Sequence, residues 1–208
     1  MVRQCRKPRW WVGQLYAGVM NRTHDRLTKW GLDHVAIGVR DNILDVGCGG
    51  GATIQRLLAR APQGHVSGVD YSDASVAVAK RTNAAEIAAG TVDVQQASVS
   101  HLPFPDNTFN VVTGVETHYY WPNLTQDLAE LRRVLKPGGR VAILAEAYAD
   151  MRFGLIEASV MRVLGTKLLT IEAHRQAMVD AGLVACEVFE ERGKGWICAI
   201  GFKADTPT

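Results

Sequence analysis

The stretch ILDVGCGGG, residues 43–51, decides the fold of this chain. It opens with a short apolar run that includes a carboxylate, a composition typical of a buried strand. A glycine cluster follows, and after it the helical pattern ATIQRLLARA at 52–61. A strand that enters a helix through such a turn brings backbone close to a ligand at the carboxyl end of the strand. The stretch therefore predicts a strand–turn–helix unit that binds a ligand.

Strands and helices keep alternating after this unit. The residue pattern predicts a helix that begins at Ser72 and ends at Gly90, and another with its leucines on one face between Leu124 and Leu135. Such alternation is typical of a mostly parallel sheet with helices on both faces. The strands predicted between these helices are HVSGVD (65–70), TVDVQQAS (91–98), FNVVTGVE (109–116) and RVAILAE (140–146).

The two ends of the chain follow other patterns. Before the first strand, apolar residues from Val12 to Trp30 recur at helical spacing, which predicts one or two helices with a break at WGL, 30–32. At the other end, the helix 170–182 precedes two strands, LVACEVFEE and WICAIGFK, joined by the turn RGKG. This is a hairpin, so one strand must run antiparallel to its neighbour.

The composition indicates one ordinary globular domain. The chain has 208 residues, of which 47% are hydrophobic and 21% charged, and the net charge of +2 is too small for a nucleic-acid-binding surface. No apolar run is long enough to span a membrane, and the start lacks a signal-peptide pattern. The four cysteines show no zinc-site spacing. We therefore expect a cytoplasmic protein without a membrane span, a nucleic-acid partner or a metal.

Two aspartates flank the glycine turn. Asp45 can meet a cationic group directly or through water, and Asp70, at the end of the second strand, can accept hydrogen bonds from both hydroxyls of a ribose. S-adenosylmethionine carries an ammonium and a ribose. A nicotinamide dinucleotide remains an alternative, because GCGGGA also fits G-x-G-x-x-A with an acidic residue about 20 positions on. Asp45, the modest chain length and the hairpin favour S-adenosylmethionine.

Four motifs together resemble class I S-adenosylmethionine-dependent methyltransferases, in particular the type 11 group with the ubiquinone and menaquinone biosynthesis enzymes. They are ILDVGCGGG (43–51), GVDYS (68–72), LPFPDNTFNVV (102–112) and ELRRVLKPGGRVAI (130–143). The resemblance runs from about residue 42 to 144. It implies an α/β, Rossmann-like three-layer sandwich with a seven-stranded, mostly parallel sheet whose last strand is antiparallel.

The resemblance also implies a cofactor site for S-adenosyl-L-methionine. The glycine turn lines the methionine part, Asp70 holds the ribose, and residues 97–99 lie along the adenine. Two positions depart from the family, since Ser98 replaces a usual acidic residue and Asn110 a usual aspartate. The residues expected to contact the cofactor are Asp45, Gly47, Cys48, Gly49, Asp70, Tyr71, Ala97, Ser98, Val99 and Glu116, together with Tyr16 and Met20 from an N-terminal helical lid over residues 1–40, which precedes the methyltransferase domain at 41–208.

The segment after the fourth strand holds the candidates for chemistry. Methyl transfer from a sulfonium is an in-line displacement, so the enzyme mainly aligns the nucleophile and excludes water. His118 is a candidate base for a hydroxyl, amine or thiol, with His24 of the lid as a second, although either can be a packing residue. The aromatic run Tyr119, Tyr120 and Trp121 is expected to bind the substrate, or else to pack under the next helix.

The substrate is expected to be a small molecule. The sequence VETHYYWPN after the fourth strand lacks the Asn/Asp-Pro-Pro-aromatic motif of enzymes that methylate base amino groups, and paired acidic metal ligands are absent there. The predicted function is methyl transfer to an O, N, C or S nucleophile. A non-catalytic S-adenosylmethionine-binding protein and an NAD(P)-dependent oxidoreductase are the alternatives. The sequence leaves open the acceptor and whether the chain forms a homodimer.

Overall fold

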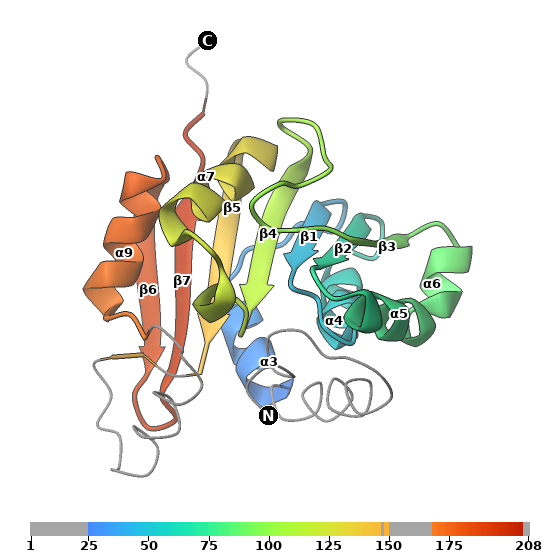
Figure 1. Ribbon diagram of the computed structural model, residues 1–208, viewed down its shortest axis with the longest axis horizontal. Helices are drawn as coiled ribbons and strands as arrows, with labels where there is room; N and C mark the ends of the chain where they lie inside the picture. Colours follow the sequence, from blue (N-terminus) through green and yellow to red (C-terminus); the bar gives the residue numbers. More distant parts are fainter. Residues whose placement is uncertain (1–24, 147, 150–167, 206–208) are drawn as a thin grey trace.

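A seven-stranded sheet forms the centre of the computed structural model, which describes residues 25–146, 148–149 and 168–205 (Figure 1). The strands are β1 (Asn42–Val46), β2 (His65–Asp70), β3 (Val92–Gln96), β4 (Phe109–Val115), β5 (Leu135–Ala145), β6 (Val184–Glu191) and β7 (Trp196–Phe202). The helices are α3 (Asp25–Asp33), α4 (Ala52–Arg60), α5 (Asp73–Thr82), α6 (Ala84–Ala88), α7 (Leu124–Val134), α9 (Ile171–Asp180) and the short 3₁₀ helix η1 (His118–Tyr120).

The strand order is β3-β2-β1-β4-β5-β7-β6. The first five strands are parallel, and β7 lies between β5 and β6 and is antiparallel to both. This confirms the expected seven-stranded sheet and the C-terminal hairpin. The chain runs outward from β1 to β2 and β3, and then returns to place β4 on the other side of β1. The carboxyl ends of β1 and β4 therefore border the switch point, where open α/β sheets bind ligands.

Apolar side chains fill both faces of the sheet, which makes a three-layer structure. On one face α3, α4, α5 and α6 cover a core that includes Ile43 of β1, and on the other α7 and α9 cover a core that includes Leu44. Neighbouring residues of β1 thus enter opposite cores, as the period of two in a strand requires. Among the helices that the structure describes, none is long and apolar enough to cross a membrane.

The predicted break at residues 30–32 is wrong, because these residues lie within α3. Gly31 faces the sheet, and a Cβ at this position would collide with the Leu144 side chain of β5. The Cys198 thiol of β7 also lies 3.4 Å from the Gly31 carbonyl. The glycine therefore allows α3 to approach the sheet closely and does not end the helix.

Two further helix boundaries differ from expectation. The helix expected from Ser72 to Gly90 is divided at Asn83, whose side-chain amide donates to the carbonyls of Gly51 (3.1 Å) and Ala79 (2.9 Å). Ser72 does cap α5, since its hydroxyl accepts from the Ser75 amide. Leu135 begins β5 and does not end α7, because the backbone turns extended at this residue.

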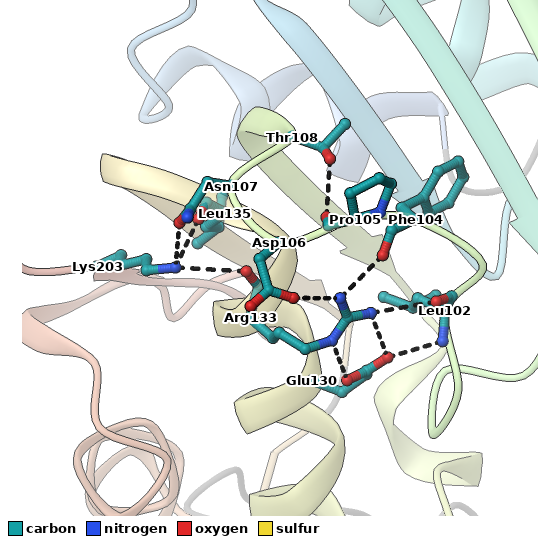
Figure 2. A network of polar contacts seen from close by, with 10 residues as sticks. All are labelled: Leu102, Phe104, Pro105, Asp106, Asn107, Thr108, Glu130, Arg133, Leu135 and Lys203. Atoms are coloured by element: carbon teal, nitrogen blue, oxygen red, sulfur yellow. Dashed lines mark hydrogen bonds and ion pairs between the residues drawn. The ribbon is translucent and has the colours of Figure 1, made fainter.

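A polar network fixes the long connection from β3 to β4 (Figure 2). The Arg133 guanidinium of α7 donates to the carbonyls of Leu102 and Phe104 and pairs with Asp106 (2.7 Å) and Glu130 (2.8 Å). Lys203, after β7, donates to the Asn107 side chain and to the carbonyls of Arg133 and Leu135. Two of the sequence motifs, 102–112 and 130–143, are thus joined by hydrogen bonds at the amino ends of β4 and β5, away from the switch point.

We predict that Gly31→Ala lowers the free energy of unfolding by about 1–3 kcal/mol, because the methyl group must displace Leu144 from a close-packed core. At a solvent-exposed helical position the same change raises stability by about 0.5–1 kcal/mol. The sign of the change in urea denaturation therefore tests the close contact. A stabilised variant would contradict it.

Candidate functional site

The turn after β1 is tied to β2 by its backbone. The amides of Gly47 and Cys48 both donate to the Val69 carbonyl, at 2.8 and 3.0 Å, and the Gly51 amide donates to the Cys48 carbonyl at 2.9 Å. Gly47 and Gly49 have φ angles of 73° and 53°, a left-handed region that favours glycine. The turn is therefore held in one shape before any ligand arrives.

The glycines of this turn serve different purposes. A Cβ at Gly47 would collide with Thr117, and one at Gly51 would collide with the Asn83 side chain. At Gly49 a Cβ would meet no atom within 4 Å. A side chain at Gly49 would therefore enter open space, whereas a side chain at Gly47 or Gly51 would meet protein.

Asp45 is a buried carboxylate with one oxygen left over. Its side chain is 1% exposed, and Oδ1 accepts a hydrogen bond of 2.8 Å from the Thr113 hydroxyl of β4. Oδ2 is buried and has no partner in the described part of the chain. Burial raises the pKa of this carboxyl from 3.8 to about 7, although the Thr113 hydrogen bond opposes the shift. A cationic donor beside Oδ2 would satisfy it.

Asp70 ends β2, the strand next to β1, and its charge acts on Asp45. Its Oδ2 accepts from the Gly49 amide at 2.9 Å and its Oδ1 from the Ser72 amide at 2.8 Å. Burial raises the pKa of Asp70, and these two backbone amides oppose the shift. Each carboxylate oxygen retains a lone pair beyond the one used, so Asp70 is oriented and can still accept from two hydroxyls. The next side chain, Tyr71, is 58% exposed.

The residues expected along the adenine follow β3. The Ala97 amide donates to the Asp70 carbonyl at 3.1 Å, which places this segment beside the end of β2. The Ser98 hydroxyl accepts from the Ser100 amide at 3.3 Å, and Val99 is buried. The Ser100 hydroxyl donates to the buried Asp127 carboxylate of α7 at 2.6 Å. A carboxylate therefore lies near this segment, although it comes from a helix and not from position 98.

Glu116 ends β4 in a strained conformation. Its φ of 56° is left-handed, which is uncommon for a residue other than glycine. The carboxylate accepts from the Glu146 amide and, at 3.4 Å, from the Tyr119 hydroxyl. Burial raises the pKa of Glu116 to about 8. The Glu116 carboxylate thus contacts the backbone that follows β5.

The segment after Glu116 packs between the turn and α9. Thr117 faces Gly47, and the Trp121 indole N–H donates to the Thr117 hydroxyl at 3.3 Å. Tyr119 is 9% exposed and packs in a cluster with Ala145, Tyr148 and Ile197, while Tyr120 and Trp121 are half-buried. His118 is 4% exposed, and its Nε2 lies 3.1 Å from Nε2 of His174 on α9. Burial, and secondly His174, lower the pKa of His118 to about 3.

Comparison with known proteins adds the family. The model of the methyltransferase domain family matches residues 43–139. An uncharacterized methyltransferase of Bacillus subtilis, YdaC, is 30% identical to this chain over 60% of it and 67% of that protein. The chain belongs to the class I S-adenosylmethionine-dependent methyltransferases. The chain is therefore an enzyme of the methyltransferase class, and the nicotinamide dinucleotide alternative is set aside.

Other relatives of this methyltransferase are longer. A demethylmenaquinone methyltransferase of Symbiobacterium thermophilum is 40% identical over 54% of this chain, which covers only 45% of that protein. The fold is shared with human N-acetylserotonin methyltransferase, solved in complex with its cofactor, at a TM-score of 0.76 and 16% identity, over 92% of this chain and 56% of that one. The chain thus spans about half the length of these two proteins.

The residues of this methyltransferase fit S-adenosylmethionine, the cofactor of the family. An ammonium would satisfy the buried, unpartnered Oδ2 of Asp45, and the open space at Gly49 leaves room for a ligand against the backbone. The Cys48 thiol is buried against Gly68 of β2, and burial raises its pKa well above the usual range. We therefore expect the backbone of Cys48, more than its thiol, to border a ligand.

Some predicted residues cannot be placed, and others were missed. Tyr16, Met20 and His24, and most of the predicted lid, lie outside the described residues. The described end of the lid, α3, packs on β5 and β7. His174 contacts His118 and Glu146 contacts Glu116, two pairings that the sequence does not indicate. The hydrogen bond from Thr113 to Asp45 does not follow from the sequence. It depends on the register of β1 and β4, which places these two residues side by side.

We predict that the stability of the unliganded enzyme falls between about pH 4 and pH 7 in part because of Asp45. Its pKa is raised from 3.8 to about 7, so over this window the folded state holds a proton that the unfolded state has lost. The stability that this proton provides is complete at low pH and is lost as the pH rises, by at most about 1.4 kcal/mol per pH unit.

Asp45→Asn removes this titration, because the amide carries no charge at any of these pH values. Urea denaturation across the window should therefore give a shallower pH dependence for Asp45→Asn than for the wild type. The comparison subtracts the contribution of Glu116, whose pKa is also raised by burial. Parallel curves for the two proteins would show that Asp45 keeps an ordinary pKa.

Proposed function

We propose that this chain transfers the methyl group of S-adenosylmethionine by in-line displacement to an O, N, C or S nucleophile of a small molecule. The observation that carries the proposal is the unpartnered, buried oxygen of Asp45 beside the open backbone at Gly49. Leaving a buried carboxylate oxygen without a donor costs stability, so its retention is best explained by a ligand that completes it. The site lies at the carboxyl ends of β1 and β4.

The chain's residues supply binding and orientation. Asp45 holds the ammonium, Asp70 accepts from the ribose hydroxyls, and residues 97–99 border the adenine. When bound, the cofactor supplies an electrophilic methyl on a sulfonium. The acceptor's lone pair forms the new bond to the methyl carbon, the carbon–sulfur bond breaks, and its electron pair stays on sulfur to give S-adenosylhomocysteine. For a hydroxyl or amine acceptor, His118 receives the proton that the acceptor loses, and water later removes it.

The aromatic segment 119–121 favours a flat acceptor. Tyr120 and Trp121 are half-buried next to Thr117, which faces the glycine turn, so their rings can border the acceptor beside this turn. Relatives carry the name demethylmenaquinone methyltransferase, so a reduced naphthoquinone belongs in a first set of acceptors. The segment at residues 1–40 would cover this site as a lid.

We predict that Asp70→Asn weakens binding of S-adenosylhomocysteine by about ten- to a hundredfold, measured by titration calorimetry. The new amide would face the donors of Gly49 and Ser72 and could no longer accept twice from a ribose. Asp73→Asn is the matched control. Asp73 is exposed in the first turn of α5, so this substitution removes the same charge close to Asp70 without changing the site. Equal losses in the two variants would indicate a general charge effect and contradict the assigned role of Asp70.

The activity itself is tested by following S-adenosylhomocysteine formation with a naphthol, a naphthoquinol, an arylamine and an alkyl thiol. We expect turnover with at least one of the aromatic acceptors and none without an acceptor. Tight cofactor binding without turnover on any of the four would favour a non-catalytic binding protein. Binding of NAD in place of S-adenosylhomocysteine would overturn the cofactor site.

A further inference from the structure

Two histidines from distant parts of the sequence meet in the interior. His118 lies in η1, directly after β4, and His174 lies in the first turns of α9. Each is 4% exposed, and their Nε2 atoms are 3.1 Å apart, within hydrogen-bond distance. Two imidazole nitrogens can share a hydrogen bond only if one of them carries a proton and the other a lone pair. The contact therefore constrains the protonation of both rings.

The backbone of α9 decides which nitrogen donates. Nδ1 of His174 lies 2.8 Å from the Thr170 carbonyl, which can only accept, so this nitrogen carries a proton. The ring also sits near the N-terminus of α9, whose positive end disfavours an imidazolium. A neutral His174 then has a lone pair on Nε2. It follows that Nε2 of His118 carries the proton of the shared hydrogen bond, and Nδ1 of His118 is left with a lone pair.

This remaining lone pair has no partner. Nδ1 of His118 is buried and accepts no hydrogen bond from any residue in the described ranges 25–146, 148–149 and 168–205. A buried acceptor without a donor costs about 1–3 kcal/mol, so an apolar residue would be more stable at this position. The unpartnered Nδ1 of His118 is therefore unfavourable if the residue only packs. It can instead receive a proton or a hydrogen bond from a ligand.

The position of His118 matches that purpose. The preceding residue, Thr117, packs against Gly47 of the cofactor turn, so η1 borders the site proposed for the methionine part of the cofactor. The ring of the following residue, Tyr119, packs against the His118 ring, with 4.1 Å between the two ring centroids. His118 is thus held by a ring contact on one side and by His174 on another.

We infer that His174 is a positioning residue, which fixes His118 as the Nε2–H tautomer so that Nδ1 accepts the proton of the acceptor's hydroxyl or amine. The inference deepens the proposed function and rests on it. The relay runs from the Thr170 carbonyl through His174 to His118, in the way that a base is oriented by a further group in other enzymes. The proton moves from the acceptor oxygen or nitrogen to the lone pair of Nδ1, and the electron pair of the broken bond stays on the acceptor atom. The step involves no oxidation or reduction.

The weak basicity of His118 is compatible with this role. Burial lowers its pKa, so at neutral pH the ring is uncharged and its lone pair is available. As the acceptor's lone pair bonds to the methyl carbon, the acceptor gains positive charge and its proton becomes strongly acidic. A weak base suffices to receive such a proton, and an uncharged ring does not repel the cationic cofactor.

The first experiment reads the tautomer without any acceptor. Nitrogen chemical shifts of isotope-labelled imidazoles distinguish a protonated from an unprotonated ring nitrogen, and they are recorded on the full chain with S-adenosylhomocysteine. We expect His118 to be protonated at Nε2 and unprotonated at Nδ1, and this preference to be lost in His174→Leu. A protonated Nδ1 in the wild type would overturn the inference.

The second experiment compares two variants on whichever acceptor of the panel turns over. In His174→Gln the amide oxygen can still accept from Nε2 of His118, whereas His174→Leu removes the acceptor at similar volume. We expect His174→Gln to keep kcat within about threefold and His174→Leu to lose about ten- to a hundredfold in kcat, with KM for S-adenosylmethionine unchanged in both. Rescue by glutamine would not occur if His174 only filled space.

The outcomes separate this inference from the proposed function. Equal loss in both variants, or a loss confined to KM, would overturn the positioning role while the methyltransferase activity stands. If His174→Leu does not fold, His174→Gln and the nitrogen shifts of the wild type still decide the tautomer. If no acceptor turns over, the proposed function fails, and the same shifts alone support or contradict the fixed tautomer.

Discussion

The site depends on one backbone contact, in which the amides of Gly47 and Cys48 converge on the Val69 carbonyl. This contact holds the turn of β1 against β2 and aligns the Gly49 amide with the Asp70 carboxylate. It also presents Gly47 to Thr117, which places the segment after β4 beside the turn. The pairing of β1 with β2 and β4 brings the strand ends together, and this contact adds the shape of the turn between them.

Polar groups are left incompletely satisfied where these strand ends meet. Oδ2 of Asp45 and Nδ1 of His118 are both buried without a partner in the described part of the chain, and Glu116 has a left-handed backbone. Each of these features lowers the stability of the unliganded fold. All three lie near the switch point, and the network of Arg133 and Lys203 lies at the opposite end of the central strands (Figure 2). The proposed site and the Arg133 network thus lie at opposite ends of the same strands.

Some of the motifs that identify the family build the site, and others build the Arg133 network. The motif at 43–51 builds the site, whereas those at 102–112 and 130–143 fasten the β3–β4 connection to α7 through Glu130 and Arg133. That connection begins with the residues proposed to border the adenine. A motif far from the chemistry can therefore affect cofactor binding by holding this segment in place.

The sequence alone determined the succession of strands and helices along the chain, the glycine turn, the hairpin and the two aspartates. Each of these follows from local periodicity or from residues close in sequence. It wrongly placed a helix break at residues 30–32. Gly31 does not end the helix; it leaves room for the Leu144 side chain of β5. Only the tertiary structure decided that Thr113 completes Asp45, that Glu116 turns to the end of β5 and that His174 meets His118. These contacts join residues 30 to 68 positions apart, and the packing of strands and helices brings such residues together where no sequence period can.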